Sequence, residues 1–188
     1  MAGSLSLPGS LYAMAVISPD RPQASEYSQF YARYIATVPD GNVIEWLEEQ
    51  KSTLRAAQKR VTPERETFRY GPGKWTVREI FGHLADAERV FGYRLMCISR
   101  GDTTSLPGFD ENSYVAASAF NTRPLWSLGD ELILVRDANL MMMKALDDEA
   151  WRRVGTANNA QISARAIAWI IAGHVDHHLA VLRERYRA

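Results

Sequence analysis

Four histidines are the residues of this sequence whose types and spacing point most clearly to chemistry. They fall in two short motifs, GHLAD at residues 82–86 and GHVDHH at residues 173–178. His174 and His178 are four residues apart, so on a helix they share one face about a turn from each other. That spacing lets two imidazoles bind one ion. The second motif therefore predicts a chelating pair.

His83 is the predicted third ligand. It lies about seven residues after the start of its predicted helix, and His178 lies about nine residues before the end of the last one. At roughly 1.5 Å of rise per residue, these depths match if the two helices run antiparallel. We therefore expect one divalent metal ion on His83, His174 and His178, with one ligand from an early helix and two from the last helix.

An ion held by three imidazoles would keep a coordination position for water or substrate, which is typical of catalytic sites. Imidazole suits Zn, Ni or Fe, and such an ion can activate water or a thiol. The alternative is a non-catalytic structural or stress-response bundle, whose site would be closed by a fourth protein ligand. His177 is the best candidate for that fourth ligand.

The neighbours of the histidines leave several roles open. Asp86 and Asp176 lie within one turn of a motif histidine and either orient a ring or are solvated charges. Glu79 and Glu88 are expected at a helix cap and at the surface. The spacing of His174 and His178 also occurs in zincin-type metalloproteases. Their motif needs Glu directly after its first histidine, but Val175 stands there, so a zincin is not expected. The glycine before each motif's first histidine predicts close approach of another group.

Composition narrows the class of protein further. The single cysteine, Cys97, excludes an internal disulfide and a cysteine-based zinc site. Lys plus Arg equals Asp plus Glu at 22 each, so the sequence lacks the usual basic footprint of nucleic-acid binding. It shows neither a secretory signal nor the roughly 20 apolar residues of a membrane helix. We expect a cytoplasmic protein with a flexible leader over residues 1–22 and one domain over residues 23–188.

Helical periodicity predicts an all-α fold, a four-helix bundle with additional short helices. The clearest helix start is at Thr76, which forms a capping box with Glu79. The aromatic run from Tyr27 to Tyr34 is either a short helix or a strap over the bundle, and residues 155–161 are either a loop or a small hairpin. The four long helices are expected at residues 43–62, 77–100, 128–146 and 163–187.

Several motifs resemble the DinB superfamily, in particular its YfiT-like branch. They are GKWTVRE at residues 73–79 leading into Gly82–Leu84, LPGFD at residues 106–110, and residues 172–186 around the second histidine motif. The resemblance covers about residues 27–187. It implies a four-helix bundle, often dimeric, with a divalent metal on the positions occupied here by His83, His174 and His178.

The resemblance also implies a range of functions. Members with assigned activities include S-transferases that use the low-molecular-weight thiols bacillithiol or mycothiol, and a mycothiol-dependent isomerase. Others are described as metal-dependent hydrolases. The resemblance therefore implies a small-molecule substrate, of which a low-molecular-weight thiol is one candidate, and a homodimer.

Overall fold

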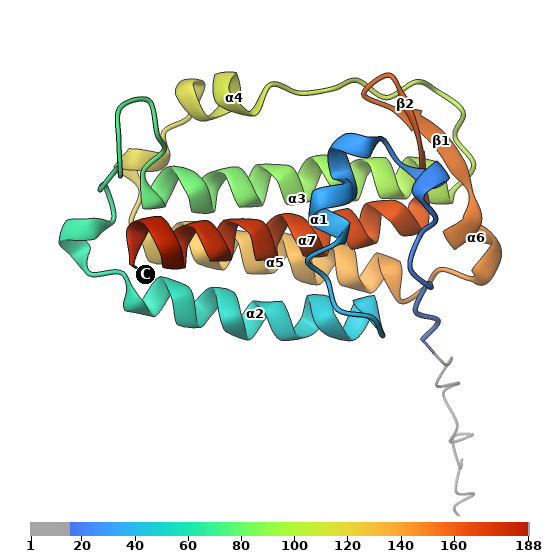
Figure 1. Ribbon diagram of the computed structural model, residues 1–188, viewed down its shortest axis with the longest axis horizontal. Coiled ribbons are helices and arrows are strands. Elements are labelled where there is room, and N and C mark those ends of the chain that lie inside the picture. Colours follow the sequence, from blue (N-terminus) through green and yellow to red (C-terminus); the bar gives the residue numbers. More distant parts are fainter. Residues whose placement is uncertain (1–15, 188) are drawn as a thin grey trace, which may run out of the picture.

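Four long helices form the body of the protein, seen in a computed structural model that describes residues 16–187. They are α2 (Val43–Arg60), α3 (Val77–Ser99), α5 (Leu125–Met143) and α7 (Ala164–Val181). A π-helical turn, Leu182–Tyr186, extends α7. Helix α3 packs against α5 and α7, and α2 closes the bundle on the opposite side (Figure 1). The predicted all-α four-helix bundle is confirmed.

The connection between α3 and α5 sets the topology. After Ser99 the chain returns along the whole bundle before α5 begins, so α3 and α5 run parallel while α7 runs antiparallel to α3 (Figure 1). This return contains the short helices α4 (Glu111–Ala117) and η4 (Phe120–Thr122). His83 and His178 were expected to lie at the same level of the bundle only if their helices run antiparallel, and α3 and α7 do so.

The remaining elements are short and lie around the bundle. A two-stranded antiparallel hairpin joins β1 (Val154–Ala157) to β2 (Ala160–Ser163), and Leu106 adds a parallel bridge to Ala157. The hairpin alternative for this region is therefore the right one. The other short helices are η1 (Ala24–Glu26), η2 (Gln29–Tyr31), α1 (Ala32–Ile35), η3 (Pro63–Arg65) and α6 (Asp148–Arg152).

Local sequence signals explain where helices begin. Thr76 Oγ1 accepts a hydrogen bond from Glu79 N at 3.0 Å, and Glu79 Oε2 accepts one from Thr76 N at 2.7 Å. This confirms the predicted capping box. Helix α5 begins at Leu125, three residues before the expected start, because Pro124 takes the extended N-cap conformation with φ −67° and ψ 145°. Helix α6 was not predicted; Asp147 caps it by accepting from Ala150 N at 2.8 Å.

The predicted leader, residues 1–22, lies mostly outside the described residues, which begin at Val16. Within the described part, Arg21 donates to the carbonyl oxygens of Ile35 at 2.8 Å and Val38 at 2.6 Å. Its guanidinium also lies 4.4 Å from the ring centroid of Trp169. Over residues 16–187, none of the helices has the length and apolar content needed to cross a membrane.

Candidate metal centre

Three histidine nitrogens converge between α3 and α7. His83 Nε2 lies 3.1 Å from His174 Nε2, and His178 Nε2 lies 3.2 Å from the same atom. All three ligand atoms lie within 4.8 Å of one another. Tetrahedral nitrogen ligands at 2.0–2.1 Å from a zinc ion are separated by about 3.4 Å from each other. The spacing of these nitrogens therefore suits three ligands of one ion.

Burial keeps the three imidazoles neutral. His83, His174 and His178 are 4%, 8% and 9% exposed. Desolvation lowers the pKa of His83 to about 4, and it lowers the pKa of both His174 and His178 well below the usual value. A neutral imidazole offers a lone pair, which is the form that binds a metal.

The hydrogen bonding of the rings is incomplete without a ligand. Three neutral rings that share one point cannot all donate and accept there, because each has a single N–H. The buried Nδ1 atom of His178 has no hydrogen-bond partner among the described residues. A cation at the centre would engage all three Nε2 lone pairs at once, so the donor set fits a divalent ion.

The predicted close approach at Gly173 is confirmed. A Cβ atom at this position would lie 1.9 Å from the carbonyl oxygen of Tyr34, so only glycine lets α1 lie directly on α7. The ring of Tyr34 then stands 5.4 Å from the ring of His174, centroid to centroid, at an interplanar angle of 90°. The glycine thus places an aromatic wall beside the second motif.

Gly82 has the equivalent role on α3. A Cβ atom there would come within 2.4 Å of the ring of Phe120, which belongs to η4. The segment after α4 can therefore pack against α3 next to His83. Both glycines allow the chain segments outside the long helices to close over the histidine level of the bundle.

Trp75 is a site residue that the sequence did not reveal as such, because it stood out only as part of the motif before the Thr76 helix cap. Its ring centroid lies 4.6 Å from that of His83 and 6.3 Å from that of His178, with the latter pair stacked at 18°. The indole covers two of the three imidazoles. Its position directly before the Thr76 cap, about two turns before His83, was the available signal.

A cavity of about 220 Å³ opens beside the histidines. Its walls include aromatic rings from α1, α3 and the return connection, together with two polar side chains, Arg94 and Asn158. Glu111 is the acidic residue of the lining, and it is exposed. The aromatic wall residues are Phe30, Tyr31, Tyr34, Trp75, Phe91 and Phe109.

The other predicted neighbours do not orient the rings. Asp176 accepts from Trp46 Nε1 at 3.0 Å and from Gln50 Nε2 at 2.7 Å, and so points to α2. Asp86 forms an ion pair of 3.5 Å with Arg89. His177 is half-buried and lines the cavity, but it is outside the group of converging nitrogens. Burial lowers its pKa.

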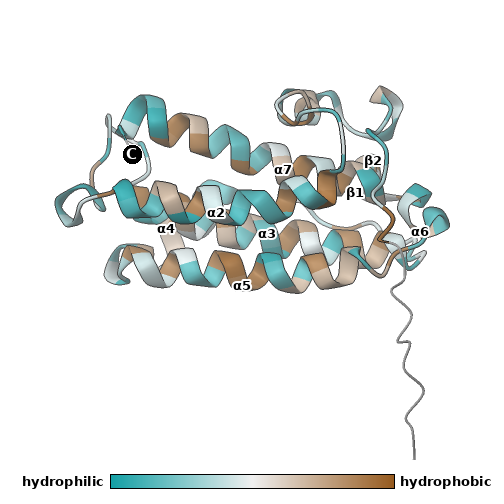
Figure 2. Ribbon diagram, turned by 90° about the horizontal axis from the view of Figure 1, so that it is seen from below, coloured by the Kyte–Doolittle hydropathy of each residue, from teal (hydrophilic) through white to brown (hydrophobic). Residues whose placement is uncertain are grey.

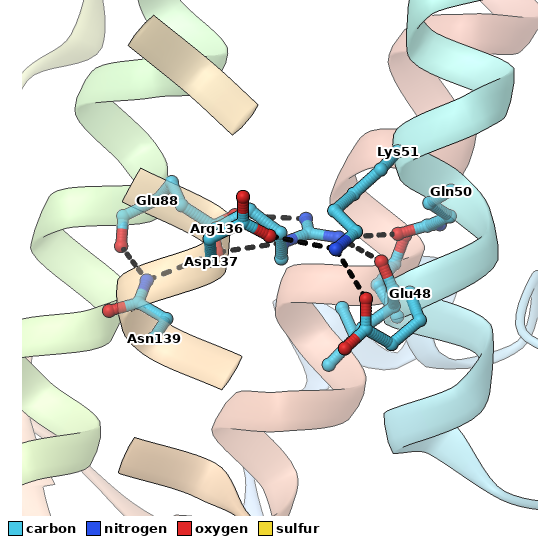
Figure 3. A network of polar contacts seen from close by, with 9 residues as sticks. Glu48, Gln50, Lys51, Glu88, Arg136, Asp137 and Asn139 are labelled. Atoms are coloured by element: carbon cyan, nitrogen blue, oxygen red, sulfur yellow. Dashed lines mark hydrogen bonds and ion pairs between the residues drawn. The ribbon is translucent and has the colours of Figure 1, made fainter. Parts of the chain in front are cut away.

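Glu88 is a correction to the sequence prediction, which placed it at the surface. It is 3% exposed and accepts two hydrogen bonds from Arg136, at 2.8 and 2.9 Å (Figure 3). Arg136 also donates to Leu47 O and Gln50 Oε1, each at 3.1 Å. The surface prediction failed because Glu88 is buried only through its pairing with Arg136 on α5, a partner that the sequence around Glu88 does not indicate.

These features define a class: an all-helical bundle with a return connection, in which three buried histidines from two antiparallel helices converge beside an aromatic cavity. Within that class the chain belongs to the DinB superfamily, whose family model matches residues 47–182. The expected family is thereby confirmed. No protein with a curated description matches the chain by sequence.

Solved structures share the fold at low sequence identity. One is YfiT from Bacillus subtilis, described as "a probable metal-dependent hydrolase with an unusual four-helix bundle topology"; it is 21% identical, with a TM-score of 0.72 over 88% of this chain and 91% of that chain. Another is a mycothiol-dependent maleylpyruvate isomerase, 15% identical, with a TM-score of 0.58 over 78% of this chain and 61% of that chain. At such identities the likeness shows the fold.

Proposed function

We propose that His83, His174 and His178 bind one divalent metal ion through Nε2 and that the protein is a metal-dependent enzyme. The observation that carries this proposal is the convergence of three neutral imidazole nitrogens next to a cavity. The ion is Zn, Ni or Fe, the metals that imidazole ligands suit. The reaction class is thiol S-transfer or hydrolysis, on a small-molecule substrate.

The chemistry follows from what the residues leave available. When bound, a divalent ion supplies a Lewis acid that lowers the pKa of water or of a thiol. The three histidines add no negative charge, so they do not weaken that acidity. Trp75 and the buried position of the rings keep bulk water away, which strengthens electrostatic interactions inside the cavity.

The fold relatives support both branches of this reaction class. One is described as a probable metal-dependent hydrolase and another as a mycothiol-dependent isomerase. We extend the second description to this chain only as a proposal, that a low-molecular-weight thiol is one of its substrates. The aromatic walls of the cavity suit an apolar co-substrate.

A non-catalytic metal-binding bundle is the second candidate function. It is favoured by the half-buried ring of His177, which lines the cavity with its centroid 5.1 Å from that of His178, and it requires this ring to turn in as a fourth ligand. A structural site of that kind would couple metal binding to folding. Chelation would then sharply lower the melting temperature, whereas an open catalytic site tolerates metal removal better.

The first test is metal content by mass spectrometry on untagged protein, before and after chelation. We expect near one ion per chain in the wild type and in His177→Ala, which is the matched control in the same motif. His83→Ala, His174→Ala and His178→Ala should each lose the ion and keep the helical circular dichroism spectrum. A wild type that takes up neither Zn, Ni nor Fe under loading conditions would contradict the proposal.

A homodimer is a further part of the proposal, supported by α5. Figure 2 shows hydrophobic segments along this helix between hydrophilic ones. Trp126, Leu134 and Met141 are 64%, 69% and 76% exposed and share its outer side. Large apolar side chains exposed together on one side of a helix favour contact with another surface.

A further inference from the structure

A second buried arginine lies in the wall of the cavity. Arg94 is 3% exposed and lies eleven residues after His83 on α3, which is about three turns, so the two share one helix face. Its side chain lines the same cavity as the three histidines. A helix side chain leans toward the N-terminus of its helix, and for Arg94 that direction leads toward His83.

The charge of Arg94 is not neutralised within residues 16–187. Its only hydrogen bond in that range is from Nη2 to the carbonyl oxygen of Pro107, at 2.7 Å. No Asp or Glu oxygen of the described residues lies within 4.0 Å of its guanidinium, whose carbon is 5.6 Å from the ring centroid of Phe91. A guanidinium has five N–H donors, so most of them remain available.

Buried charges in proteins are normally paired, because an unpaired charge away from water is costly. A fold retains one where a ligand supplies the missing partner. The surroundings of Arg94 indicate what kind of ligand that is. The cavity of about 220 Å³ is smaller than the roughly 300–1,000 Å³ of sites for drug-sized ligands, and its walls are aromatic.

A second polar group lies at the same cavity. Asn158 takes the first position of the two-residue turn between β1 and β2 with φ 51°, and its side chain packs against Gly108 and lines the cavity. The carbonyl oxygen of Pro107, next to Gly108, accepts the hydrogen bond from Arg94. Helix α3 and the hairpin turn thus bring one guanidinium and one carboxamide to the cavity, and the return connection holds the guanidinium through Pro107.

We propose that Arg94 binds the carboxylate of a small aromatic carboxylic acid, which is the substrate class of this cavity, with Asn158 as a further donor. The inference rests on the proposed function in that the other end of the substrate faces the histidine centre. A guanidinium binds a carboxylate through two parallel N–H···O bonds. A single arginine in a small aromatic cavity suits a monoanion better than a phosphate dianion.

The competing explanation is that Arg94 only holds the return connection through Pro107. The two explanations differ in what they predict for a matched pair of ligands. A structural role would change the binding of a charged and a neutral ligand equally, since both depend on the shape of the cavity. A carboxylate-binding role changes only the charged one.

The experiment uses zinc-loaded full-length protein and calorimetric titration with 4-mercaptobenzoate and 4-(mercaptomethyl)benzoate, each beside its carboxamide. The thiol anchors the probe at the metal, and two lengths sample the distance to Arg94. In the wild type we expect at least one carboxylate to bind about 10-fold or more tightly than its carboxamide, the strength of charge-assisted hydrogen bonds. In Arg94→Met this ratio should fall to within about 2-fold, with carboxamide binding unchanged.

Two further variants keep the result interpretable. Arg33→Met is the matched control, because Arg33 is exposed beside Phe30 and Tyr34 and should leave the ratio within about 2-fold of the wild type. Arg94→Gln keeps an N–H donor for the carbonyl oxygen of Pro107 but removes the charge, so its ratio should also fall to within about 2-fold even if Arg94→Met fails to fold. A ratio in Arg94→Gln as high as in the wild type would overturn the inference.

Other outcomes separate this inference from the proposed function. Equal affinities for carboxylate and carboxamide in the wild type, or an equal loss of both in Arg94→Met, would overturn the role of Arg94 and leave the metal centre intact. If neither thiol binds, the thiol branch of the proposed function is contradicted. Benzoate and benzamide titrated by ligand-observed NMR then decide the role of Arg94 alone: a preference for benzoate that Arg94→Met removes upholds it, and no preference overturns it.

Discussion

Two buried arginines, Arg136 in the middle of the bundle and Arg94 at the cavity, differ in how many of their hydrogen-bond donors have a partner in the described chain. Arg136, 0% exposed in the middle of the bundle, is matched by the carboxylate of Glu88, a backbone carbonyl and the amide of Gln50. Arg94, 3% exposed at the cavity, has one carbonyl oxygen as its partner. The first region is complete by itself. Under our proposal a ligand completes the second region, and this contrast would separate stability from function.

The same contrast holds for the groups around each arginine. Glu88 also accepts a hydrogen bond from Asn139 Nδ2 at 3.1 Å (Figure 3). Gln50 connects Arg136 to Asp176 on α7. At the candidate metal centre, by comparison, three nitrogens face one another and the buried Nδ1 of His178 lacks a partner in the described chain. Closed polar networks hold a bundle together, whereas open ones mark a binding site.

Glu88→Leu tests the closed region and should have the largest effect. Removing the carboxylate leaves Arg136 as a buried unpaired charge, which costs about 3–5 kcal/mol in the free energy of unfolding. Urea denaturation measures the change. The double variant Glu88→Leu/Arg136→Met should recover most of the loss, because it removes both charges. A single variant as stable as the wild type would show that the ion pair does not hold the bundle.

A matched control lies at an exposed ion pair. Glu149 is paired with Arg153 at 2.7 Å, but its side chain is 79% exposed. Glu149→Gln should therefore change the free energy of unfolding by less than about 1 kcal/mol, the usual range for surface pairs. A cost similar to that of Glu88→Leu would mean that burial does not decide the difference.

The open region should make the metal-free protein sensitive to acid. The pKa of His83 is about 4 when folded and 6.5 otherwise, so between these values the unfolded chain binds a proton that the folded chain does not. Stability therefore falls as the pH drops from 6.5 towards 4, by up to about 3 kcal/mol for this residue. Urea denaturation of metal-free wild type and His83→Leu at several pH values should show a smaller slope in the variant; equal slopes would contradict the assignment.

Replacing a histidine at neutral pH should cost little by comparison. In metal-free protein, His178→Leu removes a ring with an unpartnered buried nitrogen and keeps an apolar side chain, so we expect a change in the free energy of unfolding below about 1 kcal/mol. Its metal content should be zero. A loss as large as that of Glu88→Leu would place His178 among the structural residues and remove the contrast between the two regions.

The outside of α5 should give the smallest effect on stability. Leu134 is 69% exposed, so Leu134→Glu should change the stability of the folded chain by less than about 0.5 kcal/mol. It should nevertheless shift a homodimer to monomer, measured by light scattering after size-exclusion chromatography. Asp130→Glu, on the same helix, is the control that keeps the charge. A variant that remains as dimeric as the wild type would move the proposed interface elsewhere.

The sequence was sufficient for the features that repeat locally. The period of apolar residues predicted the long helices, the Thr76 capping box fixed the start of α3, and the spacing of His174 and His178 placed them on one face. Even the meeting of His83 with that pair followed from depth along antiparallel helices. Each of these depends on residues within a few turns of one another or on helix geometry alone.

Features that depend on distant partners could not be predicted. Arg136 is 48 residues from Glu88, so nothing near either residue signals their burial as a pair. Trp75 covers two imidazoles only because α7 returns beside the start of α3. The helix after Asp147 is too short to have a recognisable period. Pairing across the fold, rather than local preference, decided these cases.

Short segments laid over the bundle supply about half of the cavity wall, among them Tyr34 on α1, Phe109 in the return connection and Asn158 in the hairpin turn. The histidines instead stand on the long helices. A wall residue on a short segment could therefore be exchanged for another, which would alter which molecules bind, without disturbing the packing that holds the three histidines. Such an arrangement would let related bundles evolve to bind different small molecules while they keep the same three histidines.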